Sequence, residues 1–139
     1  GAILSPILFC IYFDVLLDNL SLPGIGCHIG LFFVGALAYA DDLVLLAPSA
    51  NAMRSMLHVC DVYAAQYNVL FNANKSKCIC CHPIGISKLY SRFSCYSSFF
   101  IGSQLIEFVA RWPHLGHKIT NDCDDSEDLN AKKRSLVVK

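Results

Sequence analysis

Two adjacent acids, Asp41 and Asp42, interrupt a long run of β-forming residues. Neighbouring side chains on a regular strand point to opposite faces, so only a turn brings both carboxylates into one small volume. Like charges that lie so close repel each other unless they face solvent or a cation. Because Mg²⁺ binds carboxylate oxygens and Asp is also common in plain turns, the pair predicts either a metal-binding turn or a solvated β-turn.

Cysteine and histidine are the other residues whose spacing could bind a metal. The chain has eight cysteines, and no secretion signal favours a disulfide framework, so we expect reduced cysteines. A C-x-x-C pair and a later H-x-x-H pair leave a zinc-binding module as an alternative. The interval between the pairs is about twice the usual ~12–15 residues of a finger, which makes this alternative the weaker one. Its ligands would be Cys78, Cys81, His114 and His117.

Composition excludes several classes of protein. The chain has 139 residues with 11 basic and 11 acidic side chains, which gives a net charge of zero. Hydrophobic residues make up 55%, and charged residues make up 16% against about 25% in an ordinary soluble domain. This composition excludes disorder and a generally basic surface for nucleic acids. It fits a domain with a large core, or a piece of something larger.

Membrane insertion is not expected from the two most apolar stretches. Residues 3–17 contain Asp14 and fall short of the ~20 residues that span a bilayer. Residues 25–46 are long enough but contain Asp41 and Asp42, each of which costs about 2.5–3.5 kcal/mol near a bilayer centre. We therefore predict no membrane-spanning segment.

The elements around the acid pair follow from periodicity and capping residues. Residues 5–20 predict a helix that is apolar nearly all round, as in helices buried within larger folds. Residues 31–39 and 43–47 predict two strands joined by a tight turn. Ser49 predicts the N-cap of an amphipathic helix that ends near Tyr67. The carboxylates would thus lie at a hairpin tip between two helices.

The second half of the sequence is less regular. Residues 83–98 show no clean period, and acids before bases after Asn121 suit the dipole of a helix that starts near residues 124–126. The predicted order of elements is that of an α+β fold with antiparallel strands. The remaining expected elements are a strand at 69–71, a polar turn at 72–77, a strand at 78–81, a hairpin at 99–112 and a strand within 113–120.

Four segments in order resemble the motifs of reverse transcriptases, particularly those of non-LTR retrotransposons. Residues 39–42 read Y-A-D-D, and residues 1–9 resemble the family's G-x-x-L-S-P segment. Residues 72–77 resemble the N-x-x-K-[ST] segment, and residues 114–120 resemble the Y-L-G-h-x-I segment, with His in place of the aromatic. Together these motifs cover residues 1–120, which is far more specific than a lone tetrapeptide.

The resemblance implies the palm of a polymerase, an antiparallel sheet backed by helices, and template-directed DNA synthesis with two metal ions, Mg²⁺ or Mn²⁺. It implies that Asp41 and Asp42 bind the metal and that Lys75 acts on the leaving pyrophosphate, although Lys75 could instead be an exposed turn lysine. It also implies contacts with the template, primer or incoming nucleotide by a set of six residues. These are Ser5, Pro6, Tyr39, Ala40, Leu115 and Gly116.

The resemblance also sets expectations for organisation. Residues 1–120 would be a partial palm domain and residues 121–139 the start of a thumb or connecting segment. The fingers, the rest of the thumb and the family's first catalytic Asp would come from a parent polypeptide, so we expect the isolated chain to be inactive. Expected partners are an RNA template, a DNA primer and deoxynucleoside triphosphates, in an intracellular setting. A domesticated, non-catalytic module that binds nucleic acid or protein is the remaining alternative.

Overall fold

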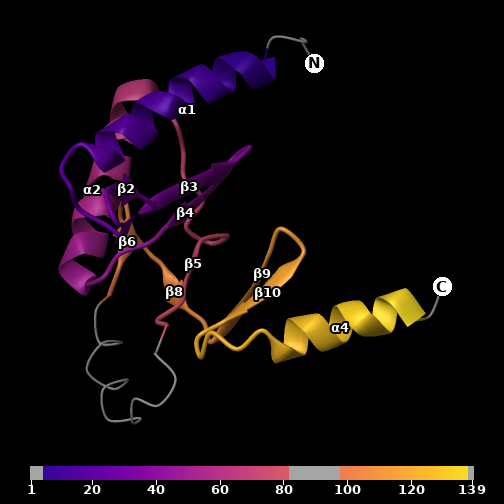
Figure 1. Ribbon diagram of the computed structural model, residues 1–139. Helices are drawn as coiled ribbons and strands as arrows, with labels where there is room; N and C mark the ends of the chain where they lie inside the picture. The colour runs from indigo at the N-terminus through magenta and orange to yellow at the C-terminus, as the bar shows by residue number, and fades with distance from the viewer. Residues whose placement is uncertain (1–4, 82–97, 138–139) are drawn as a thin grey trace. The chain divides into compact units, whose positions relative to one another are not determined.

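The computed structural model describes residues 5–81 and 98–137, which divide into two compact units (Figure 1). The first unit contains residues up to Phe71 together with Ile101–Ser103. The second contains Asn72–Phe100 and Gln104–Lys139. Each unit is described by itself, and the mixture of helices and small sheets confirms the α+β class.

Two helices form most of the first unit. Helix α1 spans Ser5–Ser21 and helix α2 spans Ala50–Tyr67, close to the predicted bounds. Helix α2 begins as expected, because the Ser49 hydroxyl accepts a hydrogen bond from the Ala52 N–H at 3.2 Å. It ends at Asn68, whose left-handed backbone lets its N–H donate to a carbonyl of the last turn.

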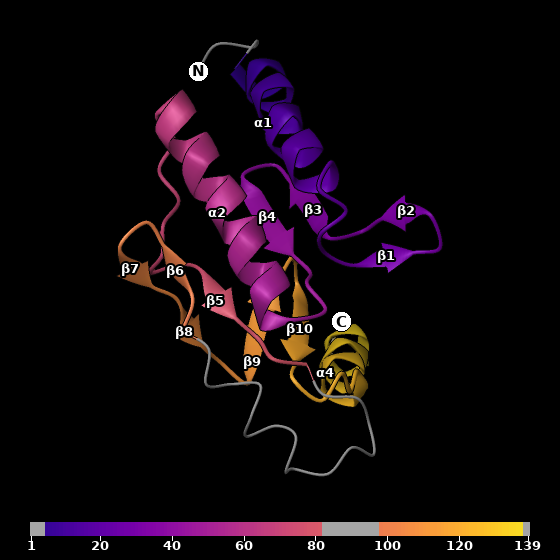
Figure 2. The ribbon, with the colours of Figure 1, turned by 90° about the vertical axis from the view of Figure 1, so that its left-hand side faces the viewer.

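The core of the first unit lies between these helices and a hairpin of β3 (Ala36–Tyr39) and β4 (Asp42–Leu45). Leu16 and Leu20 of α1 and Met56 of α2 are almost fully buried. Partly buried residues from one face of the hairpin pack against this core, namely Ala36, Leu43 and Leu45. Both helices therefore pack on one face of the hairpin, as predicted. Figure 2 shows the helices side by side.

A separate hairpin precedes β3, where the sequence predicted a single strand from residue 31. Its strands are β1 (His28–Ile29) and β2 (Phe32–Phe33), joined at Gly30, which has a φ of 60°. The left-handed backbone at Gly30 turns the chain without steric cost, and this divides the run of β-forming residues. The predicted strand at 31–39 is therefore two strands, because Phe32–Phe33 belongs to this separate hairpin and Ala36–Tyr39 pairs with β4. Figure 2 shows this hairpin projecting from the first unit.

The second unit contains short ladders and one helix. Strand β5 (Lys77–Cys78) pairs in parallel with β8 (Glu107–Phe108). A hairpin of β9 (Arg111–His114) and β10 (His117–Thr120) is followed by helix α4 (Ser126–Val137). Strand β10 and the C-terminal helix agree with the prediction, whereas the pairing of β10 with β9 in a hairpin over residues 111–120 was not predicted. The parallel pair departs from a purely antiparallel fold.

Other predictions are corrected or lie outside the described residues. Residues 69–71 are not a strand, because they lead directly from the end of α2 into the Asn72 turn. The hairpin predicted at 99–112 is shorter, with β6 (Phe100–Ile101) and β7 (Gln104–Leu105). The irregular segment 83–98 falls almost wholly outside the described residues. In the described part of the chain the strands form five two-stranded ladders, so a continuous palm-type sheet stays a prediction.

Candidate active site

The acid pair lies at the tip of the β3–β4 hairpin. The register pairs Tyr39 with Asp42, so Ala40 and Asp41 form a two-residue turn. Ala40 has a φ of 51°, in the left-handed region that disfavours residues with a Cβ. Such turns match the right-handed twist of the two strands, and the hydrophobic pattern on either side fixes their register. Local sequence thus places both acids at the hairpin turn, as predicted.

Both carboxylates are exposed and available to a ligand. Asp41 is an exposed residue of the turn, and Asp42 pairs with Tyr39, so Asp42 lies on the same face as Tyr39 and Leu37. That face is the one away from the helices, and Tyr39 is 65% exposed on it. Within the described ranges neither carboxylate has a hydrogen bond or ion pair. The two negative charges are therefore compensated by solvent or by a ligand.

The donor set suits a hard divalent cation but does not complete its coordination. Carboxylate oxygens are the protein ligands that Mg²⁺ prefers. However, residues 5–81 and 98–137 contain no group of three or more His, Cys, Asp or Glu side chains placed to hold a metal. Asp41 and Asp42 could therefore supply part of the coordination of such a cation, and a complete site would need further ligands.

Lys75, in the turn before β5, and Lys77, at the start of β5, differ in their contacts. Asn72 accepts from the Lys75 N–H through its side chain at 3.2 Å and its carbonyl at 3.1 Å, which leaves the Lys75 side chain exposed. Lys77 is held, because its ammonium donates to Glu107 at 2.7 Å and to the Asn74 carbonyl at 3.1 Å. Lys75 is therefore the lysine of this turn that can reach a ligand.

The other predicted binding residues lie at helix and hairpin ends. Ser5 is the first residue of α1 and Pro6 follows it, while their side chains lie outside the described set. Leu115 and Gly116 form the turn between β9 and β10, with φ values of 48° and 76°. Leu115 is half exposed, so a hydrophobic side chain stands at the tip of this hairpin.

The zinc alternative receives no support from the described residues. His114 and His117 face each other as a cross-strand pair, but no group of three potential ligands forms around them in the described part of the chain. Cys60 is buried in the core, and burial raises its pKa to about 12. That thiol packs in the core as a small hydrophobic group, whereas Cys10 on α1 is exposed.

Comparison with known proteins now decides the family. Residues 1–119 match the family described as reverse transcriptase (RNA-dependent DNA polymerase). The chain belongs to the reverse transcriptase family. This match covers the Y-A-D-D turn, the Lys75 turn and the β9–β10 hairpin, which are the segments that carried the resemblance in the sequence.

A curated relative narrows the type. The chain is 32% identical, over 99% of its length, to the retrovirus-related Pol polyprotein from type-2 retrotransposable element R2DM of Drosophila melanogaster. This supports a reverse transcriptase segment of the non-LTR retrotransposon type. The chain spans 13% of that relative's length, so the activities of a whole polyprotein are not shown for it. No solved structure matches the chain significantly. No helix among the described residues is long and apolar enough to cross a membrane.

The structure of this reverse transcriptase segment also reveals a cluster that sequence reasoning missed. Asp128 of α4 accepts from the Lys118 N–H at 3.1 Å and from the Lys132 ammonium at 2.9 Å, and it lies 3.1 Å from His117 Nδ1. These hydrogen bonds, that from Lys132 foremost, lower the Asp128 pKa. The i,i+4 spacing of Asp128 and Lys132 was the available signal. The cluster fastens α4 to β10.

Proposed function

We propose that this chain supplies the metal-binding turn of an RNA-directed DNA polymerase. The observation that carries the proposal is the pair of exposed carboxylates at Asp41 and Asp42, without partners among the described residues, in a chain of the reverse transcriptase family. Carboxylates that nothing in the fold requires are available for a cation and for substrate phosphates. The proposed reaction is template-directed nucleotidyl transfer from a deoxynucleoside triphosphate to a DNA primer on an RNA template.

In this proposal Asp41 and Asp42 hold the metal through their oxygens, and the left-handed turn at Ala40 sets the direction of Asp41. A bound pair of Mg²⁺ or Mn²⁺ ions would supply Lewis-acid stabilisation of the attacking and leaving oxygens. Tyr39 shares an exposed face with Asp42, which suits contact with the primer terminus. Ala40, next to Tyr39, has a small side chain, so the end of the primer strand could approach the turn closely.

The remaining residues take positioning roles. Lys75, exposed on its turn, would neutralise or protonate the leaving pyrophosphate. Ser5 and Pro6, at the start of α1, would help position the template and the incoming nucleotide. Leu115 and Gly116, at the tip of the β9–β10 hairpin, would contact the primer strand. These assignments rest on the family motif and on the exposure of Lys75 and Leu115.

The isolated chain should not extend primers. Two-metal transfer needs ions held about 3.5–4 Å apart, and the described residues offer two carboxylates rather than a full ligand set. A net charge of zero also provides little of the phosphate attraction that drives non-specific binding to nucleic acids. We therefore expect no primer extension by residues 1–139 with either metal.

The decisive experiment uses a chimera in which residues 1–139 replace the equivalent segment of a complete reverse transcriptase. The chimera should extend a DNA primer on an RNA template, and Asp41→Asn should abolish extension, since Asn keeps the size but loses the charge. Asp14→Asn, at an exposed acid of α1, is the matched control and should extend normally. Normal extension by the Asp41→Asn chimera would contradict the proposal and favour a non-catalytic binding module.

A further inference from the structure

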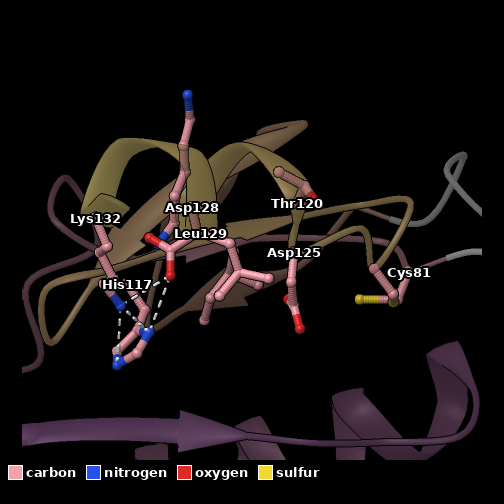
Figure 3. A pocket seen from close by; sticks show the side chains of 10 residues that line it. Cys81, His117, Thr120, Asp125, Asp128, Leu129 and Lys132 are labelled. Atoms are coloured by element: carbon pink, nitrogen blue, oxygen red, sulfur yellow. Dashed lines mark hydrogen bonds and ion pairs between the residues drawn. The ribbon is translucent and has the colours of Figure 1, made fainter. Parts of the chain in front are cut away.

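An open pocket of about 380 Å³ lies in the second unit, where β10 turns into α4 (Figure 3). One end of it holds the Asp128 cluster with His117 and Lys132. The other end holds two thiols, those of Cys81 and Cys123. Neither thiol has a part in the proposed polymerase chemistry.

The two thiols come from segments far apart in the sequence. Cys81 follows β5, and Cys123 lies in the turn between β10 and α4, where its backbone is left-handed with a φ of 56°. Both cysteines line the same pocket, which brings the two side chains near each other. Both residues are exposed, which gives small reagents access to the pair.

A structural metal does not account for this pair. The described residues place no third His, Cys, Asp or Glu with the two thiols to complete a group of ligands. A buried packing role, like that of Cys60, does not account for it either, because both residues are exposed. Two exposed thiols that line one pocket can instead be oxidised to a disulfide.

We propose that Cys81 and Cys123 are a modification site, a dithiol that a peroxide or a small-molecule disulfide oxidises to an intramolecular disulfide. The bond would tie the segment after β5 to the turn that starts α4. Both ends lie in the second unit, so the link needs no contact between the units. It would hold the start of α4 in place independently of the Asp128 hydrogen bonds.

The reaction balances with hydrogen peroxide as the oxidant. The first thiolate attacks one peroxide oxygen, the O–O bond breaks, and a sulfenic acid and hydroxide form. The second sulfur attacks the sulfenic sulfur, the S–O bond breaks, and hydroxide leaves, so two thiols and one peroxide give one disulfide and two waters. Desolvation foremost, with the neighbouring Cys123, raises the Cys81 pKa, so Cys81 is the slower nucleophile and suits the second, resolving step.

The test oxidises the folded chain of residues 1–139 with hydrogen peroxide in one arm and oxidised glutathione in another. After acid quenching and tryptic digestion, mass spectrometry should find peptide 78–88 linked to peptide 119–132, and fragmentation should place the bond at Cys81. The linked peptide should be dominant in the folded chain and minor when oxidation is done in denaturant, where the eight cysteines pair without preference. Reductant should reverse it.

Single substitutions provide the matched controls. Cys81→Ser and Cys123→Ser should each eliminate the linked peptide, whereas Cys80→Ser should retain it, since Cys80 lies in the same peptide. The oxidised chain should also unfold at a higher temperature than the reduced chain, and this difference should vanish in Cys123→Ser. The proposal would be overturned if the folded chain forms no bond between Cys81 and Cys123. It would also be overturned if Cys81→Ser still gives the linked peptides in equal amount, joined through Cys78 or Cys80.

Discussion

Acidic side chains gather in two regions, and the regions differ in what holds the carboxylates. At the β3–β4 turn, Asp41 and Asp42 are exposed and have no hydrogen-bond or ion-pair partner among the described residues. Where β10 turns into α4, Asp122 accepts from the Thr120 hydroxyl at 2.6 Å, and Asp128 joins three groups. Carboxylates with such partners organise local structure, whereas carboxylates without them are available to a ligand. This contrast supports the metal-binding role proposed for the first region.

Removing one carboxylate charge from each region should give the largest difference in primer extension and in stability. In the chimera, Asp42→Asn should lower primer extension on the order of a hundredfold or more, because a preorganised charge at the reacting centre is lost. Its stability should not fall, since the Asp42 carboxylate has no partner in the described residues. Asp128→Asn should do the opposite, with extension largely retained and the second unit less stable.

The measurements are primer extension and thermal unfolding, made on the Asp42→Asn and Asp128→Asn chimeras under the same conditions. The comparison fails if Asp42→Asn destabilises the chain as much as Asp128→Asn does. It also fails if Asp128→Asn removes extension while the protein stays folded.

Acid should loosen the second region selectively. Hydrogen bonds lower the pKa values of Asp122, Asp124, Glu127 and Asp128, in the last case from Lys132 foremost. A carboxyl whose folded pKa is lowered contributes stability above its unfolded pKa, and that contribution is lost as pH falls through the folded pKa. The loss should therefore begin below about pH 4, near the unfolded values.

Trp112 provides the measurement, because it is the only tryptophan and lies on β9, the partner strand of β10. In the chain of residues 1–139, the fluorescence of Trp112 should change as the pH falls from about 5 to about 2. Asp128→Asn should flatten part of this change. Lys133→Gln, at an exposed position of α4, is the control and should leave the profile as it is.

Two nearby lysines, Lys75 in the turn and Lys77 at the start of β5, sharpen the same contrast between side chains with and without partners. Lys75→Ala should lower extension by the chimera by about a hundredfold, the scale of a proton-transferring group, with little change in stability. Lys77→Ala should lower stability, because it removes the ion pair with Glu107 and the contact with the Trp112 ring at 5.7 Å. Equal losses of extension in both variants, with both proteins folded, would make Lys75 an ordinary turn lysine.

The elements that local signals specify were predicted well. Ser49 predicted the start of α2, and the apolar spacing predicted its buried face. The acid pair between β-forming runs predicted the β3–β4 hairpin, since turn and register depend on neighbouring residues. The candidate site is local in this sense, which is why the sequence placed Asp41 and Asp42 correctly.

The features that depend on distant partners were not predictable. The parallel pairing of β5 with β8 joins segments about thirty residues apart, and nothing in either two-residue strand specifies the other. The docking of Asp128 onto the Lys118 N–H likewise depends on tertiary placement of α4. The extra hairpin at Gly30 was missed for a local reason, because its flanking residues are strong β-formers that hide the turn.

The smallest expected effects come from the two hairpin turns that carry a residue with a Cβ in the left-handed region. Ala40 has a φ of 51° and Leu115 a φ of 48°. Such a conformation costs an L-residue about 1–2 kcal/mol, and glycine removes that cost while losing about 0.5–1 kcal/mol of entropy on folding. Ala40→Gly and Leu115→Gly should therefore each raise the free energy of unfolding by up to about 1 kcal/mol.

Ala40→Gly and Leu115→Gly should have similar effects on stability but different effects on primer extension. In the chimera, Ala40→Gly should lower extension several-fold, because glycine lets the backbone beside Asp41 sample more conformations and the carboxylates spend less time in the metal-binding geometry. Leu115→Gly removes a half-exposed side chain from the other hairpin, and should weaken primer affinity while the rate with saturating primer is kept. Chemical denaturation together with extension at varied primer concentration measures both quantities. If Ala40→Gly gains stability and keeps its full rate, the turn at Ala40 is a structural hairpin with no positioning role. A loss of stability in both variants would show that neither turn is strained.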